Sequence, residues 1–193
     1  MKKLFFLAFS MAMTMAASAQ ITWNAKLGGG IATLWGSDAD DAKPHFVAKA
    51  GVGLEKPLSA NLSLMPSLEV AWKGFKYDES GFDFTGDILY VQIPVVAAYR
   101  VNLSSDWNLA LKAGPYFAYS VYDHGKISSG GYSYSASNEL DIKKFDVGLD
   151  AGIDFEHHRF VFGVEGEMGF LSLAGSDAKI NNLAFYATVG YKF

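Results

Sequence analysis

The last eleven residues, 183–193, alternate along their whole length between two kinds of side chain. One face is mainly apolar and the other is smaller and more polar: Leu183, Phe185, Ala187, Val189, Tyr191 and Phe193 against Ala184, Tyr186, Thr188, Gly190 and Lys192. Successive side chains of a strand point to opposite faces, so the pattern predicts a β-strand, and its length suits one tilted crossing of a bilayer, which takes about 9–11 residues. A strand at a chain end needs a partner on each edge, and a closed barrel provides both by pairing the last strand with the first.

The other end of the chain has the pattern of a secretory signal peptide. Met1, Lys2 and Lys3 form a short basic start, and residues 4–17 form an apolar run. Ala17, Ser18 and Ala19 form a small-x-small cleavage site directly before Gln20. We therefore expect a signal peptide over residues 1–19, cleaved after Ala19, and a barrel domain over residues 20–193. The chain contains no cysteine, so we expect neither a lipoprotein anchor nor a disulfide framework.

Composition narrows the class further. The chain carries 16 basic and 20 acidic residues, and two of the lysines lie in the predicted signal peptide, so we expect no nucleic-acid partner. Aromatic residues make up 15% of the chain and glycine occurs 20 times. After the signal peptide no segment is continuously apolar for the ~20 residues of a membrane helix, which favours β-structure.

Eight stretches of the chain alternate in this way: residues 21–32, 45–56, 61–74, 88–101, 107–121, 144–156, 159–171 and 183–193. Apart from Lys56 at the very end of the second stretch, no charged residue falls on the apolar face. A membrane barrel must keep this register, because a lysine or arginine on the lipid side at mid-depth costs roughly 2–4 kcal/mol.

The links between these stretches alternate in length. Residues 57–60, 102–106 and 156–159 are short links, whereas residues 33–44, 75–87, 122–143 and 172–182 are long ones. Short periplasmic turns and longer extracellular loops are typical of outer-membrane barrels. The sequence thus predicts an all-β, eight-stranded antiparallel up-and-down transmembrane barrel, whose four long links are candidate sites for an extracellular ligand.

A soluble eight-stranded calyx of the lipocalin kind is the main structural alternative, with its apolar face turned inward around a lipophilic ligand. Side-chain size favours the membrane barrel. Glycines such as Gly28, Gly51, Gly148 and Gly163 lie on the polar face, as the crowded interior of an eight-stranded barrel requires. Aromatic residues near the strand ends suit the two interfaces of a bilayer: Trp23, Trp72, Trp107, Tyr119, Phe155, Phe160, Phe170, Tyr191 and Phe193.

Several segments carry a family resemblance: residues 90–95, 113–117, 148–156 and 190–193. With them the chain resembles the PorT-like, porin-family outer-membrane β-barrel domains and is similar in size to the OmpX and OmpA barrels. The resemblance implies a bacterial outer-membrane location and contact with outer-membrane lipid. Tyr191 and Phe193 resemble the signal by which the barrel-assembly machinery recognises a C-terminal strand. Pro94 and Pro115 lie inside predicted strands, where we expect a bulge or a strand end.

Charged residues of both signs share the face opposite the apolar one, and a narrow barrel would turn them into its lumen: Lys26, Lys49, Glu69, Lys73, Arg100, Lys112, Asp146, Asp150, Asp154, Glu165, Glu167 and Lys192. Buried charges need partners, so we interpret the set as a network of ion pairs and hydrogen bonds that fills the core. A path for ions or small solutes is the alternative, although eight strands leave little open space.

Catalysis is a weaker hypothesis. A barrel enzyme acting on lipid would need a histidine near a serine or carboxylate at the outer leaflet. His45 and His124 lie in or beside long links, but neither has a partner at a diagnostic spacing, and the pair His157 and His158 falls in a short turn. We expect no catalytic, metal or cofactor site, and a monomeric protein with a structural or surface-interaction role.

Overall fold

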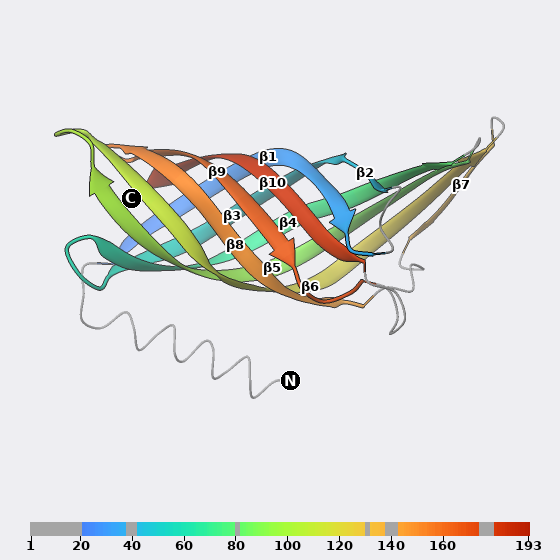
Figure 1. The fold of residues 1–193 in the computed structure, drawn as a ribbon, viewed down its shortest axis with the longest axis horizontal. Coiled ribbons are helices and arrows are strands. Elements are labelled where there is room, and N and C mark those ends of the chain that lie inside the picture. Colours follow the sequence, from blue (N-terminus) through green and yellow to red (C-terminus); the bar gives the residue numbers. More distant parts are fainter. Residues whose placement is uncertain (1–20, 38–41, 80–81, 130–131, 138–142, 174–179) are drawn as a thin grey trace.

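Eight strands form a closed antiparallel barrel in the computed structural model, which describes residues 21–37, 42–79, 82–129, 132–137, 143–173 and 180–193 (Figure 1). The barrel strands are β1 (Thr22–Trp35), β3 (His45–Pro57), β4 (Leu62–Glu79), β5 (Phe82–Asn102), β6 (Trp107–Ser129), β8 (Phe145–His157), β9 (Phe160–Gly169) and β10 (Asn181–Lys192). Each pairs with the next, and β10 closes the ring on β1 from Asn24↔Lys192 to Trp35↔Asn181. The predicted all-β, eight-stranded antiparallel fold is confirmed.

Three short turns lie at one end of the barrel, which we call the turn end, together with the C-terminus (Figure 1). They cover residues 58–61, 103–106 and 158–159, close to the predicted short links. In the tightest, His158 has a φ of 52°, in the left-handed region that non-glycine residues rarely adopt. We call the opposite end the loop end. The three predicted short links therefore all lie at the end opposite the segments that were predicted as long links.

Apolar side chains cover the outside of the barrel and charged side chains fill its inside. Leu27, Phe162 and Val164 are 62%, 48% and 59% exposed, whereas Glu69 and Glu167 are each 1% exposed. A calyx would have the reverse arrangement, since a soluble protein buries its apolar face. The orientation predicted for a membrane barrel is correct.

Beyond the barrel, part of the wall continues as a projecting sheet at the loop end (Figure 1). It consists of residues 74–79 of β4, 82–87 of β5 and 124–129 of β6, with two short strands, β2 (Ala42–Lys43) and β7 (Tyr132–Ser137), at its edges. The expectation of long loops over residues 75–87 and 122–143 was therefore wrong for most of their length. Residues 38–41, 80–81, 130–131, 138–142 and 174–179 of the predicted long links lie outside the described residues, as does the predicted signal peptide.

The projecting sheet has a simple cause in the sequence. The period of two persists beyond Trp72 and Leu89, but the faces exchange character: the outward face becomes polar and the inward face becomes aromatic, as at Phe75 and Phe84. The predicted strands end where this exchange occurs, because they were defined by an apolar outward face. Backbone pairing does not stop there, because Glu79 is still opposite Phe82 at the tip of the β4–β5 hairpin.

Prolines are accommodated in the middle of strands, contrary to our expectation of a bulge or strand end. Pro94 is paired with Tyr116, and Pro115 with Leu149. On the other side of each proline the pairing is interrupted. Within these described strands, Ile93 and Pro94 have no paired residue on β4, and Gly114 and Pro115 have none on β5. Since proline lacks a backbone donor, the ladder tolerates it as a local gap. The register shift in β5 lies elsewhere, between Leu89 and Tyr90.

Within the described residues no helix is long and apolar enough to cross a bilayer.

Candidate functional site

The lumen is the most highly charged part of the molecule, and every barrel strand contributes to it. All of the residues predicted to face inward do so, and most are buried: Lys26, Lys49, Glu69, Lys73, Arg100, Lys112, Asp146, Asp150, Asp154, Glu165, Glu167 and Lys192. Alternation positions each of them, because a residue two places along a strand returns to the same face.

Glu165, on β9, is the centre of the network. Its carboxylate lies 2.9 Å from Lys26 Nζ and 2.6 Å from Lys112 Nζ, and it also contacts Lys49. Lys112 lies in turn 2.6 Å from Asp154 Oδ2. These lysines come from β1, β3 and β6, so one buried carboxylate links strands from around the whole ring.

Glu69 and Glu167 extend the network toward the loop end. Lys26 Nζ lies 3.0 Å from Glu69, while Lys49 and Lys73 lie 2.8 Å and 2.7 Å from the two oxygens of Glu167. Gln92 donates one hydrogen bond to each carboxylate, at 3.2 Å and 2.8 Å. Each buried charge here thus faces a charge of opposite sign, which offsets its loss of hydration.

A second cluster closes the turn end. Arg100 lies 2.5 Å from Glu55 and 2.9 Å from Glu156, and Lys192 lies 3.0 Å and 2.8 Å from the same two carboxylates. Lys192, in the last strand, is thereby tied to β3 and β8. Sequence reasoning left Glu156 out of the lumen set, although this residue ends the predicted stretch 144–156 and shares the parity of Asp154.

Toward the loop end the lumen changes from charged to aromatic and then apolar. Asp146, fully buried, accepts hydrogen bonds from Tyr116 Oη at 2.9 Å and Asn182 Nδ2 at 3.1 Å. Above it lies an apolar cap of buried side chains: Leu34, Phe75, Ile88 and Leu173, with Tyr90 and Tyr116 beneath them. The cap was not predicted, because Leu34, Phe75 and Leu173 lie in segments that the sequence assigned to loops.

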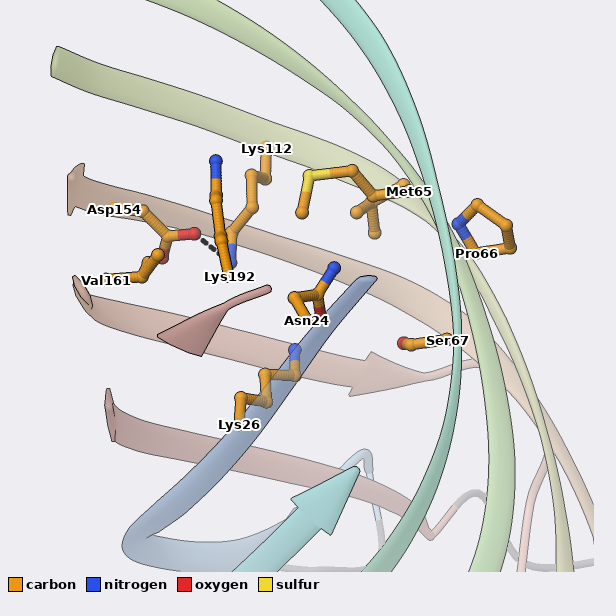
Figure 2. Close-up of a pocket in the computed structure, with 10 residues that line it drawn as sticks. Asn24, Lys26, Met65, Pro66, Ser67, Lys112, Asp154, Val161 and Lys192 are labelled. Atoms are coloured by element: carbon orange, nitrogen blue, oxygen red, sulfur yellow. Dashed lines mark ion pairs between the residues drawn. The ribbon is translucent and has the colours of Figure 1, made fainter. Parts of the chain in front are cut away.

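One small cavity of about 40 Å³ lies inside the turn-end half of the lumen (Figure 2). Asn24, Lys26, Lys112, Asp154 and Lys192 line it, with Lys112 and Asp154 paired across one side. It has room for a few water molecules, since one water needs about 10–15 Å³. Around this cavity the described side chains form a filled polar core.

Glycine allows the lumen to hold so many long side chains. A Cβ atom on Gly51 would lie 2.5 Å from Glu69 Cγ and 2.9 Å from the carbonyl oxygen of Leu68. On the outer face, a Cβ on Gly29 would meet nothing closer than 3.7 Å. Space inside the wall, and not backbone conformation, therefore requires glycine at position 51.

We expect Gly51→Ala to destabilise the barrel by about 1–3 kcal/mol, because the added methyl group overpacks the lumen. Gly29→Ala is the matched control and should change stability little. Urea unfolding of the refolded protein in lipid vesicles, followed by tryptophan fluorescence, measures both. Equal midpoints for the two variants would contradict this account of the lumen.

The histidines considered for catalysis have structural neighbours. His45 Nε2 lies 3.1 Å from Asp87 Oδ1, which also accepts a hydrogen bond from Trp72 Nε1 at 3.0 Å. His157 stacks on Trp107 with ring centroids 4.4 Å apart. In the part of the chain that the structure describes, no three His, Cys, Asp or Glu side chains are grouped to hold a metal ion.

The terminal aromatic residues lie on the outer surface at the turn end. Tyr191 packs edge-on against Phe160 and Phe193, each with a centroid distance of 5.3 Å. The backbone amide of Phe193 donates to the carbonyl of Trp23 at 2.8 Å, so the last residue still belongs to the seam between β10 and β1.

A closed barrel with an apolar exterior and a charged, filled lumen defines an integral β-barrel protein of the membrane. The family model for the outer membrane protein beta-barrel domain matches residues 10–175, and the chain belongs to this family. The protein is accordingly located in the bacterial outer membrane.

The chain is similar to several solved structures. A major outer membrane protein of Thermus thermophilus is 12% identical, with a TM-score of 0.53 over 90% of this chain and 99% of that one. Neisserial surface protein A is 11% identical, with a TM-score of 0.50 over 89% and 97%. The attachment invasion locus protein Ail of Yersinia pestis is 20% identical, with a TM-score of 0.48 over 89% and 98%. At these identities the likeness concerns the fold. The search of curated proteins returned no match.

Proposed function

We propose that this protein is a non-catalytic, monomeric surface-interaction protein that binds extended polypeptide segments along the β7 edge of its projecting sheet. The loop end, which carries this sheet, faces the cell exterior. An exposed sheet edge presents unpaired backbone donors and acceptors, and an added strand can satisfy them. The observation that supports the proposal is the difference between the two edges of the sheet.

The β2 edge is protected against strand addition. β2 has two residues, Ala42 and Lys43, and Pro44 follows directly. Short length, lysine and proline are the features by which natural proteins blunt sheet edges. Strand addition on this side of the projecting sheet is therefore disfavoured.

The β7 edge has none of these features. β7 has six residues, Tyr132–Ser137, with the sequence Tyr-Ser-Tyr-Ser-Ala-Ser, which contains no charge and no proline. Among the described strands it pairs with β6 alone. Tyr134 is 67% exposed, so a large aromatic surface lies beside the free edge. Backbone pairing supplies affinity in this mode of binding, and side chains such as tyrosine supply specificity.

The charged lumen has a structural role in this proposal. Paired charges and the apolar cap support a filled core that holds the strands in register, in preference to a path for ions or solutes. The signal peptide, the relation to PorT-like proteins and the recognition of Tyr191 and Phe193 by the barrel-assembly machinery are parts of the same proposal. The exposed aromatic cluster at the C-terminus supports the last of these.

Proline substitutions in β7 test the proposal. A phage library of short peptides is selected on the protein in lipid nanodiscs, and enriched peptides are expected to slow hydrogen exchange of β7 amides. Successive amides point to opposite edges of a strand, so one of Tyr134→Pro and Ser135→Pro removes a donor from the free edge and the other removes a donor to β6. The variant that lacks the free-edge donor should weaken binding by roughly three- to ten-fold, as expected for one lost hydrogen bond. The other variant should also weaken binding, because it loosens β7 from β6.

The same substitution on the opposite edge, Lys43→Pro, is the control and should leave peptide affinity unchanged. Enriched peptides that protect other segments, or that bind all three proline variants as tightly as the wild type, would show that β7 is not the binding edge.

A further inference from the structure

The inward face of the projecting sheet carries a row of large apolar side chains that ends at the β7 edge. Pairing places Phe84 of β5 opposite Ile127 of β6, and Ile127 opposite Tyr134 of β7. Directly opposite residues of an antiparallel sheet point to the same face, so the three side chains lie next to one another. We call them the apolar row.

Exposure rises along the apolar row toward the free edge. Phe84 is half-buried and packs against Phe75 of the apolar cap, with ring centroids 5.9 Å apart. Ile127 is 45% exposed and Tyr134 is 67% exposed. A side chain in the middle of a sheet is covered on both sides by its neighbours on the adjacent strands. The apolar row is therefore least covered at β7, where an added strand would place its own side chains.

The other face of the same edge is polar. Thr85, Lys126 and Ser135 lie directly opposite one another on β5, β6 and β7, each adjacent in sequence to a member of the apolar row. Lys126 and Ser135 are exposed. The β7 edge thus separates an apolar face from a polar one. A strand added there would continue both faces, because its successive side chains alternate between them.

We propose that the polypeptide segments bound at the β7 edge have large apolar side chains, aromatic ones above all, at alternate positions on the face that they share with Tyr134. This inference rests on the proposed strand addition and names the class of segment that the edge selects. An aromatic side chain directly opposite Tyr134 would cover its exposed ring and bury a large apolar area of its own. A carboxylate at the same position would lose hydration against the Tyr134 ring and the Ile127 side chain.

Three synthetic peptides of equal length test the inference with the full protein in lipid nanodiscs. The first alternates tyrosine and threonine over eight residues, the second has the same composition with the tyrosines in adjacent pairs, and the third alternates serine and threonine. In an extended strand the first peptide places all its tyrosines on one face, whereas the second divides them equally between the two faces. Fluorescence anisotropy measures the affinities, and empty nanodiscs correct for binding to lipid.

We expect the alternating tyrosine peptide to bind at least five-fold more tightly than the paired one, since each favourable cross-strand aromatic pair contributes up to about five-fold. Tyr134→Ser keeps the backbone amide of β7 but removes the ring. It should weaken binding of the alternating tyrosine peptide by roughly three- to five-fold and leave the affinity of the serine–threonine peptide unchanged. Tyr134→Phe should retain the preference, and Ser135→Ala, on the polar face, is the matched control that should also retain it.

Equal affinities of the alternating and paired tyrosine peptides, or an undiminished preference in Tyr134→Ser, would overturn the inference. Hydrogen exchange of the β7 amides separates this result from a failure of the proposed strand addition. Equal affinities with protected β7 amides would overturn the preference and leave strand addition standing. Peptides that do not bind, or that bind without protecting β7, would overturn both proposals.

Discussion

Replacing Glu165 with glutamine is expected to lower the free energy of unfolding by about 3–5 kcal/mol. The amide retains the shape of the carboxylate but removes the charge that faces Lys26, Lys49 and Lys112. Removing one partner of a buried ion pair is costly because the other charge remains buried without compensation. Here one substitution affects three cations. Reversible urea unfolding in lipid vesicles measures the loss.

Two further variants show whether the effect arises from the network. Asp106→Asn, in an exposed turn, should stay within about 0.5 kcal/mol of the wild type. Lys112→Met in the Glu165→Gln background should not recover the loss, because Lys112 also pairs with Asp154 and its removal leaves that buried carboxylate without this cation. A loss below about 1 kcal/mol for Glu165→Gln would mean that the lumen is well hydrated and that its ion pairs contribute little.

Val164 directly precedes Glu165 on β9 and faces the opposite side of the barrel wall. Its replacement by arginine is the second substitution for which we expect a large effect. Val164 is 59% exposed, so arginine at this position would be harmless if the exterior were in water. In the hydrocarbon of a bilayer, arginine near mid-depth costs about 2–4 kcal/mol. We expect Val164→Arg to show a loss of that size in the same unfolding assay.

Leu58→Arg is the control for the surrounding medium. Leu58 is 55% exposed, almost as much as Val164, but it lies in a turn at the turn end. Its replacement should change stability by less than about 0.5 kcal/mol. If Val164→Arg were equally well tolerated, the outward apolar face would not be in contact with lipid at that height.

The two neighbours on β9 illustrate what could be predicted from the sequence. Alternation assigned Glu165 to the lumen and Val164 to the outer face, and both assignments are correct. The partners of Glu165 could not be predicted in the same way. Lys26 is 139 residues away, and the two meet only because the ring closes through β10 with a particular stagger of strands.

The loop end shows a different limit. Leu34, Phe75 and Leu173 close the lumen, although they come from segments that looked like loops. These three side chains are buried because three segments that are distant in sequence pack together over the loop end of the lumen. A local sequence pattern cannot predict such a contact.

The sequence by itself therefore determined the number of barrel strands, their direction, and the face on which each side chain lies. These properties depend on a period of two and on whether a residue prefers lipid or a polar interior, both of which are local. Only the tertiary structure decided which charges pair, how the lumen is capped, and how far the sheet projects beyond the membrane. Those depend on the register between strands distant in sequence, since a shift of two residues keeps every face unchanged but replaces every neighbour.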